Sequence, residues 1–240
     1  MGNIVLITGG AGFIGSHLAD QLLEQGHHVR ILDCLTAQVH GEARDRPAYL
    51  SPSVELIRGD IRDPAVVNRA IAGVHGVYHL AASVGVGQSM YQIADYTSVN
   101  NLGTAVLMEA LSAHPVERLV VASSMSIYGE GLYRDADGQQ VPGRRRSRAQ
   151  LAQAQWELHD DAGRPLEPIA TDEQKLPDLS SVYALSKFDQ ERLCLLVGEA
   201  YGIPTTALRF FNVYGPRQAL SNPYTGVLAI FASRLLNGNQ

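Results

Sequence analysis

A tyrosine and a lysine, Tyr183 and Lys187, stand four residues apart in a stretch, 182–200, that is predicted to be a helix. Side chains four apart on a helix share one face, so the phenol and the ammonium should be neighbours. A phenol with its ordinary pKa of about 10 is a poor base at neutral pH. A cation one turn away stabilises the phenolate, which would lower that pKa and let Tyr183 exchange a proton with a substrate.

Hydroxyl groups gather at the end of the predicted strand 119–123, in the run Ser123-Ser124-Met125-Ser126. A hydroxyl at that edge of a sheet can hydrogen-bond a reacting oxygen and orient the phenol. Tyrosine and lysine often occur at this spacing by chance. The hydroxyl run and the glycine-rich turn described next make the pattern specific.

The glycine-rich turn Thr8-Gly9-Gly10-Ala11-Gly12-Phe13-Ile14-Gly15 lies where the predicted strand 4–8 gives way to the predicted helix 14–25. Gly9 suits a tight turn, Gly12 lets the backbone approach a pyrophosphate, and Gly15 lets the helix pack closely on the strand. The helix N-terminus adds free N–H groups and the positive end of its dipole. The pattern predicts a dinucleotide site whose contacts include Gly9, Gly12, Phe13, Ile14 and Gly15.

Three later strand ends suit the same ligand. Asp33 ends the predicted strand 28–33, 18 residues after Gly15, where it can accept hydrogen bonds from an adenosine ribose and repel a 2′-phosphate. NAD is therefore favoured over NADP. The alternative interpretation of Asp33 is that it is only a turn residue at the end of its strand. Asp60 and Ile61, after strand 54–58, suit the adenine amino group and ring face. Small residues after strand 77–80 let the nicotinamide ribose approach the backbone, with contacts expected at Leu80, Ala81 and Ala82.

The elements that must position these residues alternate between short apolar runs and longer amphipathic ones. Further helices are predicted over 65–72 and 99–112, and a last strand over 205–210. Nearly continuous apolar strands are typical of a sheet covered on both faces. Their alternation with helices predicts an α/β fold with a doubly wound parallel sheet of the Rossmann type.

The composition of the 240 residues excludes several classes of protein. Hydrophobic residues make up 45% and charged residues 18%, which excludes disorder as the overall state. A net charge of −5 favours no nucleic acid, and no apolar run approaches the roughly 20 residues of a membrane span. Two cysteines cannot build a disulfide framework. We therefore expect a cytoplasmic protein with neither a nucleic-acid nor a membrane partner.

Four parts are expected along the chain: an NAD-binding core over 1–130, an insertion or lid over 131–175, a catalytic helix and last core strand over 176–215, and the start of a substrate-binding portion over 216–240. The insertion breaks the strand–helix alternation, has one short helix predicted over 149–158, and carries the basic run Arg144-Arg145-Arg146-Ser147-Arg148. That run could contact phosphates, but a solvated loop is the favoured interpretation.

The sequence resembles the extended short-chain dehydrogenase/reductase family, and within it the nucleotide-sugar epimerases and dehydratases. The stretch 222–227 is similar to bacterial proteins assigned as dTDP-L-rhamnose or UDP-glucose 4-epimerases. The similarity covers nearly the whole chain and rests on the Gly9–Gly15 turn, Asp33, Gly59-Asp60-Ile61, His79-Leu80-Ala81-Ala82, Asn100 with Gly103-Thr104, Ser124 before Tyr128-Gly129, Tyr183 with Lys187, and the run 208–217.

The resemblance implies that Ser124 is the catalytic hydroxyl, Tyr183 the general base and acid, and Lys187 the lysine that holds the ribose of NAD. It implies cofactor contacts at Asn100 and Phe211. It also implies substrate contacts at Ser124, Ser126, Asn212, Arg217 and Asn222. For the positions from 211 onward, the alternative is a loop of ordinary turn residues. It also implies a homodimer through helices 99–113 and 182–200, whose apolar content core packing explains equally well. Because members of this family are longer, we expect an incomplete C-terminal substrate-binding portion.

Two positions after Ser124 distinguish activities within the family. Relatives that are 4,6-dehydratases carry an Asp-Glu pair there, and UDP-glucuronate decarboxylases carry a Glu two positions on, whereas this chain has Met125 and Ser126. The resemblance therefore implies C4 epimerisation of a UDP- or dTDP-hexose through a 4-keto intermediate. A dehydratase or dehydrogenase of the same family, and a catalytically silent NAD-binding protein, remain as alternatives. Some relatives carry paired cysteines in the insertion, which suggest a small metal site. This chain has no cysteine there, so no metal site is expected.

Overall fold

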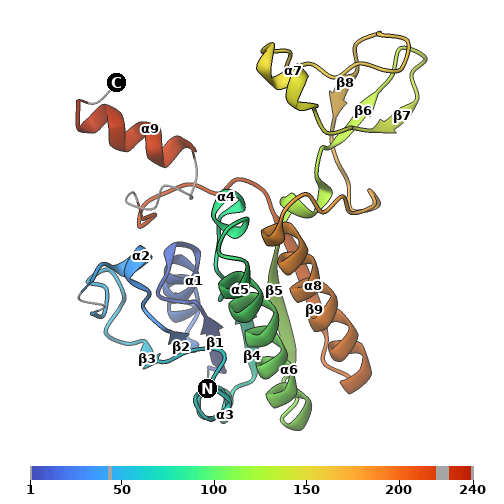
Figure 1. Ribbon diagram of the computed structural model, residues 1–240. Coiled ribbons are helices and arrows are strands. Elements are labelled where there is room, and N and C mark those ends of the chain that lie inside the picture. The colour runs from blue at the N-terminus through green and yellow to red at the C-terminus, as the bar shows by residue number, and fades with distance from the viewer. Residues whose placement is uncertain (1, 43–44, 220–226, 239–240) are drawn as a thin grey trace. The chain divides into compact units, whose positions relative to one another are not determined.

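A parallel sheet of six strands organises the structure, a computed structural model that describes residues 2–42, 45–219 and 227–238. Its strands lie in the order β3-β2-β1-β4-β5-β9 (Figure 1). The order reverses between β1 and β4, and α/β sheets bind ligands outside the carboxyl ends of their strands at such a point. The predicted doubly wound fold is confirmed. The strands are β1 (Ile4–Thr8), β2 (His28–Asp33), β3 (Glu55–Arg58), β4 (Gly76–His79), β5 (Arg118–Ser124) and β9 (Thr205–Phe210).

Helices cover both faces of this sheet. One core cluster, which includes Ile7, Leu22 and Ile31, lies beneath α1. The other, which includes Leu107 and Cys194, lies beneath α3, α6 and α8. No helix within the described part of the chain is long and apolar enough to cross a membrane. The helices are α1 (Phe13–Glu24), α2 (Ala37–His40), α3 (Pro64–Ile71), α4 (Val86–Ser89), α5 (Ile93–Tyr96), α6 (Gly103–Ala113), α8 (Val182–Tyr201) and α9 (Val227–Leu236).

The ends of α8 follow directly from the sequence. Ser181 caps its start, because the hydroxyl accepts a hydrogen bond from Ala184 N at 3.0 Å. Gly202 ends it with a φ of 68°, the left-handed conformation in which glycine is favoured. The helix thereby begins at Val182 and fixes Tyr183 in its first turn.

The predicted helix over 99–112 is divided in two. Residues Thr97–Leu102 form a π-helical turn, η1, before α6 begins at Gly103. Single π turns are rare and occur often at functional sites. Here the turn carries Asn100, which is fully buried.

Residues 125–180 form a second compact unit, separate from the unit made by residues 1–124 and 181–240. No strand is predicted there by the sequence, yet three short ones pair antiparallel in the order β7-β6-β8. The short helix is also smaller than predicted. The elements are the 3₁₀ turn η2 (Met125–Tyr128), β6 (Leu132–Arg134), β7 (Gln140–Pro142), α7 (Arg148–Ala152) and β8 (Glu167–Ile169).

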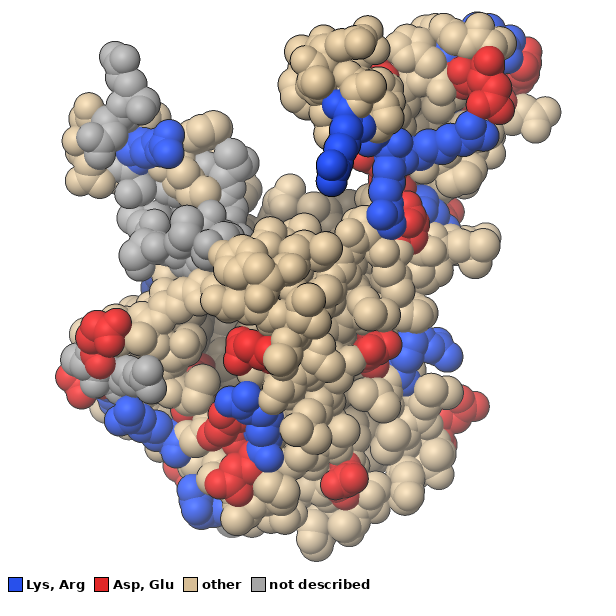
Figure 2. Space-filling model, in the orientation of Figure 1, with Lys and Arg blue, Asp and Glu red and all other residues tan. Residues whose placement is uncertain are grey.

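The basic run of this second unit is engaged in ion pairs. Arg144 pairs with Asp161 at 2.6 Å, and Arg145 pairs with Asp178 at 3.0 Å. Arg146 pairs with Glu130 at 2.5 Å. Figure 2 shows basic and acidic side chains side by side over this unit. These pairs support the solvated-loop interpretation over a phosphate-binding patch.

Candidate active site

The glycine-rich turn fits closely against the chain that follows β4. Gly9 has a φ of 69°, and a Cβ on it would lie 2.8 Å from the backbone nitrogen of Ala81. A Cβ on Gly15 would lie 2.5 Å from Gly10 Cα. Any side chain at these two positions would force β1, α1 and the end of β4 apart.

The start of α1 is suited to an anion. Its cap residue is Gly12, which has no side chain to satisfy the first N–H groups of the helix. A Cβ on Gly12 would meet only Gly9 O, at 3.4 Å, so the backbone there is accessible to a ligand. Phe13 and Ile14 open the helix, where N–H groups and the positive dipole end favour a phosphate. The turn therefore fits the pyrophosphate of a dinucleotide.

Asp33 holds this turn in place. One carboxylate oxygen accepts from Ala11 N at 3.0 Å and the other from Leu35 N at 2.9 Å. Asp33 is nevertheless 9% exposed, and each of its oxygens has a second lone pair. A ribose hydroxyl as an additional donor remains our prediction for this residue.

Asp60 and Ile61 have partners that the sequence did not reveal. Asp60 pairs with Arg62, whose Nη2 lies 2.5 Å from Oδ2 and whose N and Nε both lie 2.9 Å from Oδ1. The Arg62 hydrogen bonds hold the pKa of Asp60 below its usual value. Ile61 is buried, with its Cγ2 2.5 Å from where a Cβ of Gly103 would lie. The adenine contacts of both residues stay predictions.

The residues after β4 are tied to both β1 and α8. Ala81 N donates to Thr8 Oγ1 at 3.2 Å. Asn100 accepts from Ser83 N at 2.7 Å and donates to Ser186 Oγ at 2.9 Å, which joins this segment to α8. The predicted cofactor residues Leu80, Ala81 and Ala82 are thereby half-buried at the carboxyl edge of the sheet.

Ser124 and Tyr183 are brought together by the ends of β5 and α8. Ser124 is the last residue of β5 and 8% exposed, and its side chain is hydrogen-bonded to the Tyr183 phenol. Tyr183 N donates to Ser89 Oγ at 3.0 Å, and its ring meets Tyr96 edge-on with centroids 6.4 Å apart. The phenol is thus fixed by a hydroxyl, a backbone bond and a neighbouring ring.

Burial raises the pKa of Tyr183 above its usual value, and the Ser124 hydrogen bond offsets only part of that effect. Within the chain by itself, burial of the phenol and the Ser124 hydrogen bond decide the direction of the shift. Tyr183 is therefore a protonated phenol at neutral pH, ready to donate, and needs a further positive charge to act as a base. That Lys187 and a positive nicotinamide ring together lower this pKa stays a prediction.

Lys187 ends in a buried hydrogen-bond network that links α8 to β1, β4 and α6. Its Nζ donates to Gln190 Oε1 at 2.7 Å. Gln190 Nε2 donates to Thr104 Oγ1 at 2.8 Å, and His79 Nε2 lies 2.9 Å from that oxygen. His79 Nδ1 lies 2.7 Å from Thr8 Oγ1 in the glycine-rich turn. The network connects the lysine to the cofactor cradle.

Burial controls the charges in this network. It lowers the pKa of Lys187 to about 8, although Cys194 and Glu191 act in the opposite direction. It also lowers the pKa of His79 to about 3, helped by the nearby Lys187 charge. The imidazole is therefore neutral near pH 7, while the ammonium keeps most of its charge.

Glu191 follows Gln190 in α8 and anchors the helix to the strands β5 and β9. One carboxylate oxygen accepts from Ser123 Oγ at 2.6 Å and from Arg209 Nε at 3.1 Å, and the other from Arg209 Nη2 at 2.7 Å. Burial alone would raise the pKa of Glu191, but these hydrogen bonds bring it below its usual value. Because Ser123 precedes Ser124, the pair fixes α8 beside the end of β5.

Sequence reasoning did not identify Gln190 and Glu191. A usable signal was present, since both are polar residues three and four positions after Lys187 and so lie on its buried face of the helix. Their partners lie on other elements, so only the folded chain identifies them.

The segment after β9 lies against the start of α1. The Pro216 carbonyl is 3.1 Å from His17 Nε2, and Arg217 pairs with Asp20 at 2.7 Å and lies over the Tyr49 ring. Phe211 and Asn212 are exposed. Ser126 lies in η2 of the second unit. Asn222 lies outside the described residues, and the substrate and cofactor roles of all these positions stay predictions.

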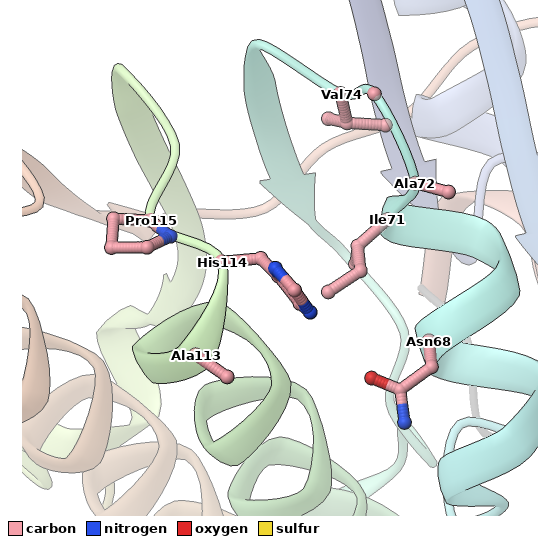
Figure 3. A pocket seen from close by; sticks show the side chains of 8 residues that line it. Asn68, Ile71, Ala72, Val74, Ala113, His114 and Pro115 are labelled. Carbon is pink, nitrogen blue, oxygen red and sulfur yellow. The ribbon is translucent and has the colours of Figure 1, made fainter.

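A hollow of about 510 Å³ lies between the C-terminal ends of α3 and α6, where Figure 3 shows His114 between the two helices. Those ends precede β4 and β5, so the hollow adjoins the amino edge of the sheet. Ser124 and Tyr183 belong to the carboxyl edge. The hollow is therefore no part of the candidate site.

Comparison with known proteins gives one family for this chain. The model of the NAD dependent epimerase/dehydratase family matches residues 5–155 and 159–240. The dTDP-L-rhamnose 4-epimerase of Burkholderia thailandensis is 37% identical over 235 residues, covering 96% of this chain and 63% of that protein.

Solved structures give the same result. The UDP-glucose 4-epimerase of Thermus thermophilus, solved with NAD, is 34% identical with a TM-score of 0.73, covering 98% of this chain and 63% of its own. The UDP-glucose 4-epimerase of Thermotoga maritima, solved with UDP-glucose, is 28% identical with a TM-score of 0.76, covering 99% and 64%. The chain therefore spans less than two thirds of the length of these relatives.

Proposed function

The chain belongs to the NAD dependent epimerase/dehydratase family, and from that premise we propose that it epimerises a nucleotide-diphosphate sugar, a UDP- or dTDP-hexose, at C4. The observation that carries the proposal is the hydrogen bond between Ser124 and Tyr183, with Lys187 one turn along α8. These groups lie at the carboxyl edge of the sheet, where such folds bind ligands. The relatives named above are 4-epimerases of such sugars.

NAD is the cofactor in this proposal, because the cradle suits it. Gly12 leaves the first N–H groups of α1 available to the pyrophosphate. Asp33 offers a carboxylate to a ribose and repels a 2′-phosphate. When bound, NAD would accept the C4 hydride and return it, so the cycle leaves no net NADH.

The residues of the chain supply the proton chemistry. Tyr183 accepts the proton of the C4 hydroxyl as the 4-keto sugar forms, and returns it when hydride comes back to the other face. Ser124 holds both the phenol and the reacting oxygen. Lys187 contributes a buried positive charge near the phenolate, which offsets part of its desolvation. The charged nicotinamide ring is the second cation that the raised pKa of Tyr183 requires.

A dehydratase or decarboxylase is disfavoured by the residues after Ser124. Elimination of water requires an additional acid, and positions 125 and 126 are Met125 and Ser126. The first acid that follows, Glu130, is engaged by Arg146 at 2.5 Å. No free carboxyl is left in that run to protonate a leaving hydroxyl. A single redox cycle at C4 is the chemistry these residues support.

The Tyr183→Phe variant tests this function. It removes the acid–base group and should lower turnover by about 10²- to 10⁴-fold, while calorimetry should show unchanged NAD affinity. Tyr96→Phe is the matched control, because it deletes a buried hydroxyl that bonds Gln88 instead of Ser124. Full turnover by Tyr183→Phe would contradict the assigned role. NAD binding without turnover in any form would instead favour the silent binding protein.

The proposal includes a cytoplasmic homodimer formed by the outer faces of α6 and α8. Leucines on this surface are 47% to 54% exposed, as expected of a surface that a second copy covers: Leu102 at the end of η1, just before α6, and Leu185 and Leu196 in α8. Light scattering should give twice the chain mass, and the monomer mass for Leu185→Glu with Leu196→Glu. A wild-type monomer at micromolar concentration would contradict this part of the proposal.

A further inference from the structure

Gln190 is a buried amide placed between the Lys187 ammonium and a group of neutral polar atoms. It is 1% exposed, and its side chain bonds Lys187 at one end and Thr104 at the other. The Nε2 end also lies 3.3 Å from the carbonyl oxygen of Ala81. A buried polar side chain with every end engaged has one favoured orientation.

The orientation of the amide follows from its neighbours. If the amide were turned over, its N–H groups would face the ammonium and its oxygen would face the Ala81 carbonyl, so both contacts would become repulsive. Thr104 donates its single hydroxyl hydrogen to Asn100 O at 2.5 Å. The hydroxyl then accepts from Gln190 Nε2. His79 Nε2 lies close to both groups, 2.9 Å from Thr104 Oγ1 and 3.2 Å from Gln190 Nε2, so the imidazole packs directly beside the amide.

Neither a glutamate nor a methionine satisfies this place equally well. A glutamate would set a carboxylate oxygen 3.3 Å from the Ala81 carbonyl and would neutralise the lysine. A methionine would leave the ammonium without this acceptor and Thr104 without one donor. Glutamine gives the ammonium an acceptor while leaving its charge uncompensated.

We propose that Gln190 is a positioning residue that acts through Lys187. Its amide holds the ammonium in register with Tyr183 and links it, through Thr104, His79 and Thr8, to the glycine-rich turn. The proposal rests on the proposed function for the meaning of Lys187, but its test below needs no turnover. Failure of one is therefore distinguishable from failure of the other.

The titratable groups around Lys187 come from two elements. Tyr183, Glu191 and Cys194 lie on α8, and His79 lies at the end of β4. Glu191 is already engaged by Arg209 and Ser123, and His79 is neutral near pH 7. Burial raises the pKa of the Cys194 thiol to about 12, which keeps it neutral as well. A carboxylate at position 190 would be a new charge next to the ammonium.

The chain contains only two lysines, Lys175 and Lys187, so protein labelled with [ε-¹³C]lysine gives two signals. The Lys187 signal should titrate near pH 8. Gln190→Met should lower that pKa because a buried ammonium loses its acceptor. Gln190→Glu should raise it by about 1 or more, because an adjacent carboxylate favours the charged form. Lys175, in the other unit, is the internal reference.

Opposite shifts in the two variants are the expected result. Val197→Ala is the matched control, since Val197 packs against the core from α8 and has neither a titratable group nor a hydrogen bond to Lys187. A Lys187 titration unchanged in both variants, or displaced in the same direction in both, would overturn the proposal. If Gln190→Met unfolds, both lysine signals will shift toward that of free lysine. The direction in which Gln190→Glu shifts the pKa of Lys187 then decides the test by itself.

Calorimetry with NAD supplies a second readout. Because the network reaches Thr8 and Ala81 beside the cradle, Gln190→Met should weaken NAD binding by about 3- to 10-fold. Turnover should fall through kcat with a smaller change in the KM for the sugar. NAD affinity and kcat both equal to those of Val197→Ala would show that Gln190 contributes only packing.

Discussion

The two lysines of the chain lie in different units and have different acceptors. Lys175, 9% exposed, donates to the backbone carbonyls of Tyr128 at 2.7 Å and Leu176 at 3.1 Å. Lys187, 3% exposed, donates to a side-chain amide and lies one turn from Tyr183. The first cation ties two loop segments of the 125–180 unit together. The second donates to an amide of its own helix, and in the proposed function its charge serves the phenol. The two lysines therefore differ in their acceptors and not in their burial.

An ion pair from each unit shows a second difference, this time in burial. The pair of Arg144 with Asp161 is exposed on both sides, and such pairs contribute little in water. The pair of Glu191 with Arg209 is nearly buried and joins α8 to β9, while Glu191 also bonds β5 through Ser123. The pair that anchors α8 is therefore buried among further hydrogen bonds, whereas the pair of Arg144 with Asp161 is surrounded by solvent.

The largest expected effect is a difference in turnover between variants of the two lysines. Lys187→Met should lower turnover by about 10²- to 10⁴-fold because the phenolate loses its cation. Lys175→Met should leave turnover within about 10-fold and lower the free energy of unfolding by about 1 to 3 kcal/mol, since two carbonyls lose their donor. Steady-state kinetics and denaturant unfolding measure both. Equal losses of turnover in the two variants would break the comparison.

The second-largest expected effect is a difference in the free energy of unfolding between loss of the buried ion pair and loss of the exposed one. Glu191→Gln leaves Arg209 in a buried site without its counter-charge and should lower the free energy of unfolding by about 3 to 5 kcal/mol. Arg144→Ala removes an exposed pair and should change it by less than about 1 kcal/mol. Urea denaturation reports both values. A Glu191→Gln chain as stable as Arg144→Ala would show that α8 is anchored by apolar packing alone.

A smaller, pH-dependent effect should come from His79. Its pKa is about 3 in the folded chain and about 6.5 when unfolded, so below pH 6.5 the unfolded chain binds a proton that the folded chain does not. Stability should therefore fall as the pH decreases from 6.5, by about 2 to 3 kcal/mol at pH 4.5. His79→Gln should remove this part of the acid sensitivity. The exposed His114→Gln is the control, and an identical pH dependence in both variants would contradict the burial argument.

Much of the sheet could be predicted from the sequence, for a physical reason. Strands covered on both faces are nearly continuous apolar runs, so β1 and β2 begin and end at the predicted residues. The edge strand β9, which is only half-buried, also has the predicted bounds. The serine cap and the terminal glycine likewise fixed both ends of α8 to within one residue. The three-residue strands of the second unit lack such a run, because a half-exposed short strand needs no continuous apolar stretch.

The candidate site was predictable only in part. The family resemblance pointed to Ser124 as the partner of Tyr183, and the two side chains are hydrogen-bonded; the spacing of Tyr183 and Lys187 alone put them one turn apart on α8. The sign of the Tyr183 pKa shift within the chain by itself could not be predicted, because desolvation depends on how many neighbours the fold brings around the phenol. The partners of Asp60 and Lys187 depend equally on contacts that only the folded chain creates.

Proton NMR of the natural gene product, incubated with NAD and separate UDP-, dTDP- and GDP-hexoses, tests the central claim most directly. The account predicts a new anomeric signal from the C4 epimer of one UDP- or dTDP-hexose, without net NADH and absent in Tyr183→Phe. A 4-keto-6-deoxy product would contradict the interpretation of Met125 and Ser126. No new signal with any of these sugars, despite bound NAD, would contradict the assignment of Ser124, Tyr183 and Lys187 to nucleotide-sugar epimerisation.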